Sequence, residues 1–209
     1  MSARTLLAEA ARAVARAGLV SGTSGNLSLR AGETLLVTPT GRALAALAAE
    51  DIVALDASGR VVGAGRPTSE WRLHRAVLAA RPDLAAVVHT HSPAATAASA
   101  LGRAIPAVHY SVVAAGGEDI PCARYATPGS DALAEIAAAA LAGRDACLLA
   151  HHGAVAAAAS LEAAVALAEA VELLARIWLD LLAVTPEPPV LGAAEMAALK
   201  DAWAAYRGV

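Results

Sequence analysis

The chain has 209 residues and a net charge of −3, with 57% hydrophobic but only 3% aromatic residues. This length favours a single domain, 1–209, with room for a sizeable core. No apolar run reaches the length of about 18 residues that spans a bilayer, and no basic patch is interleaved with aromatic residues, so we expect neither membrane insertion nor nucleic-acid binding. Cys122 and Cys147 form no CxxC or zinc-finger spacing, so we expect unpaired thiols and a cytoplasmic location.

The first third of the chain combines short strands with loops that are rich in Ser, Thr and Gly. A helix over 2–17, capped by Ser2, has the pattern of an amphipathic helix and lacks the apolar centre of a signal peptide. Strands are expected at 27–30, 35–38, 52–55 and 61–62. Polar loops are expected at 21–26, 38–41 and 66–70, and the last of these opens a helix over 71–80.

These three loops allow two interpretations. Each by itself fits an ordinary turn, and Glu70 fits a surface carboxylate that complements the dipole of the helix that follows. Together they also fit a phosphate site, because hydroxyls and backbone N–H groups at a helix N-terminus converge readily on an anion.

The strand over 87–91 presents two histidines on one face. Side chains alternate along a strand, so His89 and His91 point the same way, with Cβ atoms about 6–7 Å apart. Histidine is a common metal ligand, and this span allows both imidazoles to reach one ion. The alternative is that His89 and His91 are ordinary polar strand residues that bind no metal.

The remaining chain alternates again between helices and strands. Helices are expected at 93–100, 131–141, 161–184 and 193–207. A continuous apolar strand over 146–150 runs into His151 and His152, so a second strand end offers a third histidine. Neighbouring strand residues point to opposite faces, and local pattern alone does not choose between the two. We therefore expect an α/β fold, with a central mixed, largely antiparallel sheet covered by helices.

Several motifs occur together in the order and approximate spacing of a known family. They are Gly22–Asn26, Thr38–Gly41, Thr68–Trp71, His89–His91 and His152–Gly153. On these motifs the chain resembles the class II aldolase/adducin family nearly end to end. The run Ile105–Tyr110 is similar to the branch of that family that acts on L-fuculose 1-phosphate.

The resemblance implies a metal site and a phosphate site. His89, His91 and His152 would hold one zinc ion per subunit, with Glu70 as a displaceable fourth ligand and His151 as a mere neighbour. The residues implied in substrate phosphate binding are Gly25, Asn26, Thr40, Gly41, Thr68 and Ser69. Relatives often have Ser at positions 40 and 68, and threonine retains the hydroxyl.

The resemblance also implies the reaction. A ketose 1-phosphate such as L-fuculose 1-phosphate would be cleaved reversibly to dihydroxyacetone phosphate and an aldehyde such as L-lactaldehyde. Glu70 would act as general base, and Tyr110 would reach from one subunit of a homotetramer into a neighbour's site to exchange a proton with the aldehyde oxygen. Tyr206 resembles a C-terminal tyrosine that covers the site. The single lysine, Lys200, lies far from these motifs in sequence and argues against Schiff-base chemistry.

Three alternatives stay open: an aldolase for 5-deoxyribulose or methylthioribulose phosphate, a pentulose-phosphate 4-epimerase, and a metal-free adducin-like binding module. Glu70 and Tyr110 favour an aldolase over an epimerase, because epimerases of this kind tend to carry aspartate at position 70. The three metal histidines favour an enzyme over a binding module. His74 lies four residues after Glu70 on the same helix and is a candidate to support it, but we favour a solvated helix residue. We expect His109 to face away from Tyr110.

Overall fold

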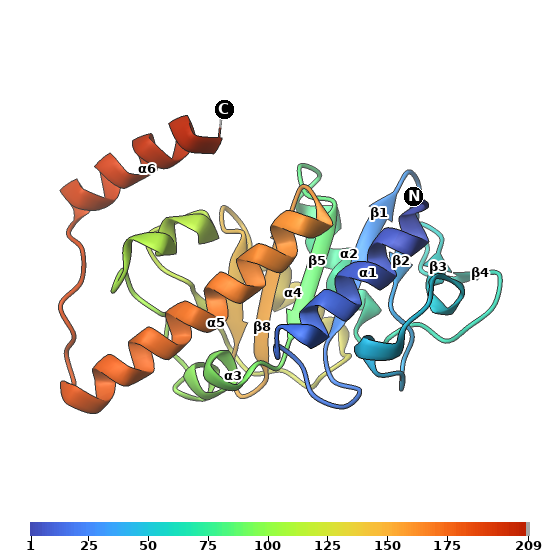
Figure 1. The fold of residues 1–209 in the computed structure, drawn as a ribbon, viewed down its shortest axis with the longest axis horizontal. Coiled ribbons are helices and arrows are strands. Elements are labelled where there is room, and N and C mark those ends of the chain that lie inside the picture. Colours follow the sequence, from blue (N-terminus) through green and yellow to red (C-terminus); the bar gives the residue numbers. More distant parts are fainter. Residues whose placement is uncertain (208–209) are drawn as a thin grey trace.

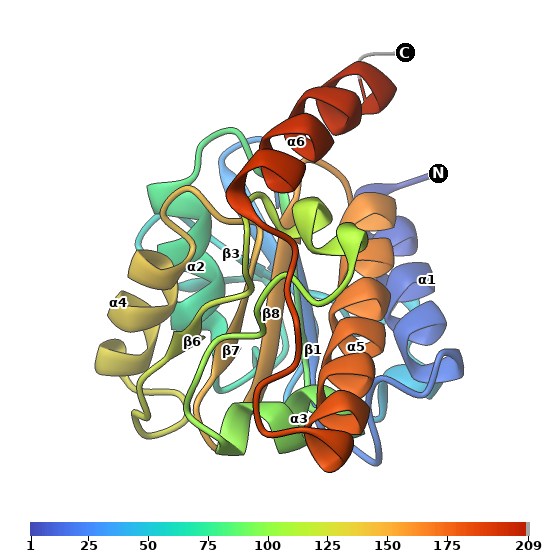
Figure 2. The same cartoon turned by 90° about the vertical axis from the view of Figure 1, so that its left-hand side faces the viewer.

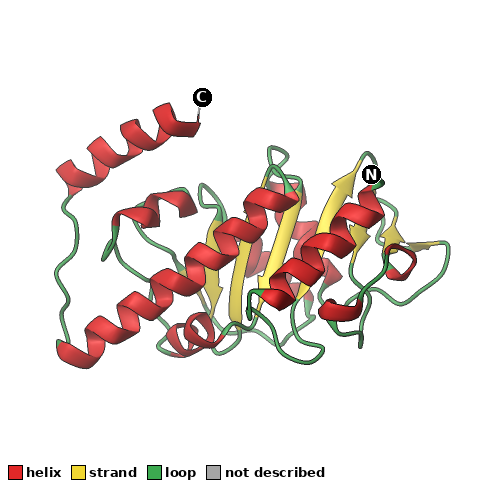
Figure 3. Ribbon diagram, in the orientation of Figure 1, coloured by secondary structure: helices red, strands yellow, loops and turns green. Residues whose placement is uncertain are grey.

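An eight-stranded sheet runs through the computed structural model, which describes residues 1–207 (Figure 3). The strand order is β4-β3-β2-β1-β5-β8-β7-β6, and neighbours are antiparallel except for the parallel pair of β6 and β7. The strands are β1 Asn26–Ala31, β2 Thr34–Val37, β3 Val53–Leu55, β4 Val61–Val62, β5 Ala86–Thr90, β6 Cys122–Ala123, β7 Ala146–Leu149 and β8 Gly153–Ala158. The expected mixed, largely antiparallel sheet is therefore confirmed.

Helices cover both faces of this sheet. Figure 2 shows α1, α5 and the short α3 on one side and α2 and α4 on the other, with α6 beyond the end of the sheet. The helices are α1 Ala3–Arg16, α2 Trp71–Ala80, α3 Pro93–Ala100, α4 Asp131–Ala140, α5 Leu161–Val184 and α6 Ala193–Arg207. Three short 3-10 helices are η1 Leu44–Ala46, η2 Ala49–Asp51 and η3 Tyr110–Ala115. The expected helices are all present, with ends that differ by at most one residue.

The central strands are buried on both faces and supply two cores. Val88 of β5 and Ala156 of β8 belong to the core under α1 and α5, whereas Val87 and Val155 belong to the core under α2 and α4. This alternation follows from the two-residue period of a strand. The small alanines of β8 allow the long helix α5 (Figure 1) to pack directly on the sheet.

Two strands, β6 and β8, were not expected from the sequence. The residues of β8 are Gly-Ala-Val-Ala-Ala-Ala, a composition with little intrinsic strand preference. Its pairing with β5 on one side and β7 on the other makes it a strand. Contacts with residues distant in sequence, and not local propensity, therefore decide this element.

A single domain over 1–209 stays a prediction, and residues 208–209 lie outside the described part. No helix between residues 1 and 207 is both long enough and apolar enough to cross a bilayer. Cys122 and Cys147 are both free thiols, as expected.

The junction of α3 and α5 gives a test of the packing. Both carboxylate oxygens of Glu172 accept backbone hydrogen bonds at the start of α3, from Ala94 and Ala95 at 2.8 Å. Glu172→Gln retains one acceptor, so we expect the free energy of unfolding to fall by about 1–3 kcal/mol in urea denaturation. Glu169→Gln, at an exposed position of the same helix, removes the same charge and should change stability by less than about 0.5 kcal/mol. Equal effects of the two substitutions would contradict this assignment.

Candidate active site

Three histidines and a glutamate meet at one point beside the central strands. His89 and His91 come from the end of β5, His152 from the turn between β7 and β8, and Glu70 from the residue before α2. Each offers one ligand atom, and these four atoms all lie within 4.8 Å of one another. The structure therefore brings together the four residues that were expected to hold the metal.

A close approach between two strands produces this arrangement. A Cβ atom on Gly153 would lie 2.2 Å from the carbonyl oxygen of Thr90 and 3.1 Å from the ring of His91. Only glycine therefore allows β8 to begin beside the end of β5, where the turn that carries His152 must lie.

The turn itself resolves which of two histidines faces the cluster. His151 adopts a left-handed conformation with φ of +56°, which reverses the chain, and its side chain is exposed near Tyr125. The backbone N–H of His152 donates to the Ser99 hydroxyl at 3.3 Å. His152 therefore points inward and His151 outward, although neither lies in a strand. Ser99 was missed by sequence reasoning, because nothing near it in sequence marks its contact with the turn.

Hydrogen bonds orient the imidazoles. His89 Nδ1 lies 2.9 Å from the carbonyl oxygen of Ala154, which can only accept, so Nδ1 carries a hydrogen and Nε2 is the ring nitrogen that faces the cluster. His89 Nε2 lies 3.2 Å from Glu70 Oε2, and His152 Nε2 lies 3.4 Å from Glu70 Oε1. His91 Nε2 lies 3.0 Å from His89 Nε2. The Nε2 atoms and the carboxylate thus face a common centre.

The donor atoms fit a divalent metal ion. Among the described residues, Glu70 Oε1 is buried without a hydrogen-bond partner, an arrangement that costs free energy unless a cation compensates it. Imidazole nitrogens together with one carboxylate are typical ligands of catalytic zinc and related metals. The residues present are therefore suited to hold a metal at this point.

The protonation states of Glu70, His91 and His152 also suit metal binding. Burial and the charge of His89 lower the pKa of both His91 and His152 to about 4. Burial raises the pKa of Glu70, but the charge of His89 and hydrogen bonds from His89 and Asn26 outweigh it, so this pKa lies below its ordinary value. At neutral pH, His91 and His152 are neutral and Glu70 is ionised, which are the forms that coordinate metals. Burial lowers the pKa of His89, but the charge of Glu70 and hydrogen bonds with Glu70 and Ala154 outweigh it, so this pKa lies above its ordinary value. A bound metal would therefore take the place of the proton on His89 Nε2.

The three polar loops lie side by side next to this cluster. Backbone N–H groups of Thr68 and Thr40 donate to the carbonyl oxygens of Thr38 and Arg66, at 3.0 and 3.1 Å. The backbone N–H of Leu27 donates to the Thr38 hydroxyl at 3.1 Å. These bonds, together with the bridge between Pro39 and Pro67, join loops that lie far apart in the sequence.

The loop residues expected to bind phosphate differ in their surroundings. Asn26 and Thr68 are buried and both contact Glu70, the first through its side chain at 2.9 Å and the second through its hydroxyl at 3.3 Å. Gly25 has φ of +75°, and a Cβ there would lie 2.3 Å from Val20. The others are exposed or half-buried: Thr40, Gly41 and Ser69. The loops therefore meet the cluster at Glu70.

Three expectations require correction. Glu70 is 5% exposed, so it is not a surface carboxylate. His74 is fully buried and not solvated, and burial together with the charge of His89 lowers its pKa to about 3. His109 does not face away from Tyr110, because their ring centroids lie 4.5 Å apart. A role for His74 in support of Glu70 was the less favoured interpretation of its spacing, because the polar residues of β1 that contact it cannot be inferred from local pattern.

One of the two expected tyrosines, Tyr110, lies outside the cluster. Tyr110 begins η3 and is 55% exposed, so its ring is accessible to a neighbouring molecule. Tyr206 lies in α6, and its side chain is not among the described residues.

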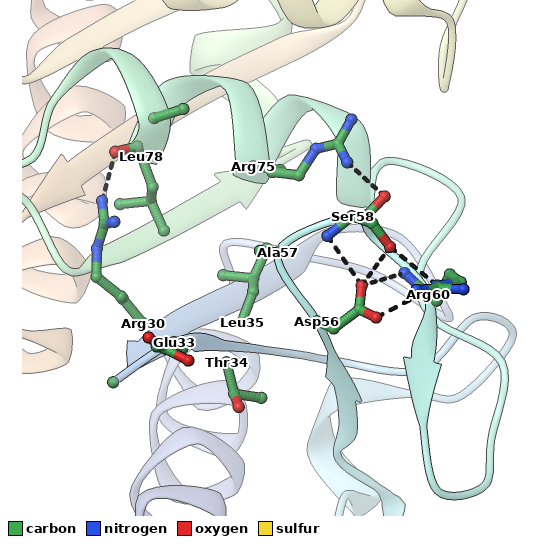
Figure 4. A pocket seen from close by; sticks show the side chains of 12 residues that line it. Arg30, Glu33, Thr34, Leu35, Asp56, Ala57, Ser58, Arg60, Arg75 and Leu78 are labelled. Atoms are coloured by element: carbon green, nitrogen blue, oxygen red, sulfur yellow. Dashed lines mark hydrogen bonds and ion pairs between the residues drawn. The ribbon is translucent and has the colours of Figure 1, made fainter.

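A groove of about 790 Å³ opens elsewhere, beside β2 and α2 (Figure 4). Its arginines already bond within the protein: Arg30 to the carbonyl oxygen of Leu78, Arg75 to that of Ser58, and Arg60 to Asp56. None of the cluster residues lines this groove, so we assign it no part in the site.

Known proteins resemble this chain in sequence and fold. The profile of the Class II Aldolase and Adducin N-terminal domain matches residues 5–179. The 5-methylthioribulose-1-phosphate/5-deoxyribulose-1-phosphate aldolase of Rhodospirillum rubrum is 49% identical over 200 residues, which cover 96% of this chain and 90% of that protein. The L-fuculose phosphate aldolase of Escherichia coli is 46% identical over 191 residues, with coverage of 91% and 89%. A solved L-fuculose 1-phosphate aldolase has a TM-score of 0.91 at 35% identity and covers 97% of both chains.

The close approach at Gly153 leads to a prediction for metal affinity. Gly153→Ala forces the start of β8 away from Thr90 and displaces His152, so we expect the affinity for zinc to fall roughly 10–100-fold. Competition with a chromophoric chelator measures this affinity. Gly192→Ala is the control, because a Cβ there makes only an ordinary 3.5 Å contact with Glu195. Unchanged zinc affinity in Gly153→Ala would show that the strand approach does not set the cluster geometry.

Proposed function

The chain belongs to the class II aldolase and adducin family, and we propose that it is a zinc-dependent aldolase that reversibly cleaves a ketose 1-phosphate. Membership of the family and the two aldolases at 46% and 49% identity confirm the expected enzyme class. One observation carries the specific proposal: Glu70 contacts both the three-histidine cluster and the loops expected to bind phosphate. A phosphorylated ketose is a substrate that needs both sites at once.

His89, His91 and His152 would hold the zinc ion, one per subunit. When bound, it would supply a Lewis acid for the ketone and the adjacent hydroxyl of the substrate. Asn26, Thr40, Thr68 and Ser69, with the backbone of Gly25 and Gly41, would bind the phosphate and so hold the ketone beside the cluster. Hydroxyl and N–H donors gathered near the N-terminus of α2 support this part of the proposal.

Glu70 would act as the general base. In the synthetic direction it removes a proton from the dihydroxyacetone phosphate carbon, and in cleavage it returns that proton. His89 and Asn26 hold the pKa of Glu70 low, whereas burial raises it. Displacement of the carboxylate away from the histidines leaves burial as the larger influence, and this makes the carboxylate a stronger base.

Tyr110 would give a proton to the aldehyde oxygen in synthesis and take it back in cleavage. Its exposure supports action across the interface of a homotetramer, in which each site is shared between two subunits. Tyr206 would cover the site from the C-terminal helix. The unpaired thiols of Cys122 and Cys147 support a cytoplasmic location.

Two groups of substrates are supported by different observations. The run Ile105–Tyr110 and the Escherichia coli relative favour L-fuculose 1-phosphate, which would release L-lactaldehyde. The Rhodospirillum rubrum relative, at 49% identity, favours 5-deoxyribulose or methylthioribulose 1-phosphate. The aldehyde part of the substrate distinguishes these candidates, whereas the dihydroxyacetone phosphate part is shared.

Cleavage assays on these substrates test the proposal. We expect the zinc-loaded protein to release dihydroxyacetone phosphate from at least one of L-fuculose, 5-deoxyribulose and methylthioribulose 1-phosphate, as measured with a coupled dehydrogenase. Removal of the metal with a chelator should abolish turnover, and added zinc should restore it. A zinc-loaded protein that cleaves no ketose 1-phosphate would refute the proposal.

The role of Glu70 has a separate test. Glu70→Gln removes the base and retains the shape of the side chain, so we expect kcat to fall roughly 10²–10⁴-fold. Zinc content, measured by elemental analysis, should stay at one ion per chain because three histidines remain. Glu118→Gln is the matched control, since Glu118 is an exposed residue whose carboxylate pairs with Lys200. Full activity in Glu70→Gln would remove this residue from the mechanism.

A further inference from the structure

A chain of hydrogen bonds leads from the interior of the protein to Glu70. Ser28 Oγ lies 2.8 Å from His74 Nδ1, His74 Nε2 lies 2.5 Å from Asn26 Oδ1, and Asn26 Nδ2 lies 2.9 Å from Glu70 Oε2. Asn26 and Ser28 share a face of β1, and His74 lies one turn of α2 after Glu70. All four residues are buried. This row of side chains therefore connects the metal cluster with the core.

The direction of each hydrogen bond follows by elimination. The Glu70 carboxylate only accepts, so Asn26 must present its amide nitrogen to it. The oxygen of Asn26 then faces His74 Nε2, and because this oxygen also only accepts, Nε2 must carry a hydrogen. The Ser28 hydroxyl is the partner of the other ring nitrogen and keeps the ring in place.

We propose that His74 is a positioning residue that fixes the orientation of the Asn26 amide, so that the NH₂ group and not the oxygen faces Glu70 and the substrate phosphate. The part that concerns the phosphate rests on the function proposed above. A reversed amide would place Asn26 Oδ1 against Glu70 Oε2, and two acceptors at that distance repel each other. The amide nitrogen has two hydrogens, so one bond to Glu70 leaves the second for an anion.

The surroundings of His74 argue against a purely packing role. Its neighbours on the buried side of α2 are apolar, namely Leu73, Val77 and Leu78. An apolar side chain would fill this position without any need for partners, whereas a buried imidazole requires a partner for each nitrogen. Both partners here are polar residues of β1. The contacts with Ser28 and Asn26 therefore account for a histidine at this position.

The composition of the chain makes the proposal directly observable. Asn26 is the only asparagine, and the sequence contains no glutamine. The Asn26 side chain therefore gives the only carboxamide NH₂ signals in a ¹H–¹⁵N spectrum of the whole protein. We expect this pair to exchange slowly with solvent, and to shift when inorganic phosphate is added.

Two substitutions separate the contribution of the N–H donor from that of packing. His74→Leu keeps side-chain volume but removes both ring nitrogens, whereas the amide nitrogen of Gln in His74→Gln reaches the place of Nε2 and keeps a donor. Val77→Ala removes buried volume from the same helix and takes away no polar group. Urea denaturation of each variant establishes that it is folded.

In His74→Leu, we expect the Asn26 NH₂ signals to shift and exchange about tenfold faster, both with zinc bound and after chelation. The dissociation constant for inorganic phosphate, measured by calorimetry on the zinc-loaded protein, should rise about tenfold, together with the KM for the ketose phosphate. His74→Gln should stay within about threefold of the unmodified protein in phosphate affinity. Val77→Ala should lower stability and leave phosphate affinity unchanged.

Three results would overturn the proposal: unchanged amide signals and phosphate affinity in a folded His74→Leu protein, equal impairment of His74→Gln, or equal loss of phosphate affinity in Val77→Ala. The NMR measurement does not depend on turnover. A protein with the expected amide behaviour but no cleavage of any ketose phosphate would refute only the proposed function. Aldolase activity together with Asn26 amide signals that do not change when His74 is substituted would refute only the role of His74.

Discussion

The burial of one charge governs the architecture of this site. The carboxylate of Glu70 is ionised and almost completely removed from water, and an isolated charge in such a place would destabilise the fold strongly. Partial compensation comes from His89 and the amide of Asn26, which contact Oε2, and from His152, which lies 3.4 Å from Oε1. The same compensation produces a cluster that a divalent cation can complete. Stability and metal binding therefore depend on the same contacts.

The sheet makes this compensation possible, because its order brings distant segments to one place. The central strands β1, β5 and β8 are neighbours, and each contributes at one end a residue or loop of the site. Their two buried faces pack against α1 and α5 on one side and α2 and α4 on the other. The ends of these strands are thus held rigidly, so functional side chains placed there also keep fixed positions.

Local patterns predicted the elements well and the environments of single residues poorly. The start of the first helix followed from its cap Ser2, whose hydroxyl accepts a hydrogen bond from the backbone N–H of Thr5 in the first turn. The burial of Glu70 and His74 did not follow, because a polar residue on a helix is usually solvated. The spacing of four residues between Glu70, just before α2, and His74 was the available signal. It aligns Glu70 with the buried face of α2, to which His74, Val77 and Leu78 belong. The strand β8 was not predicted because alanine favours helices, and only pairing with β5 and β7 makes this segment extended.

The sequence by itself determined the fold class and, through the family motifs, the four residues that meet in the cluster. These features depend on short-range periodicity and on residue types that few other functions require. The tertiary structure alone decided how one turn points His152 inward and His151 outward, that three loops lie side by side, and that His74 contacts Asn26. Each of these depends on contacts between segments that are distant in sequence, such as the approach of Gly153 to Thr90. Such contacts leave no local pattern, because they arise only when the strands pair and the helices pack on them.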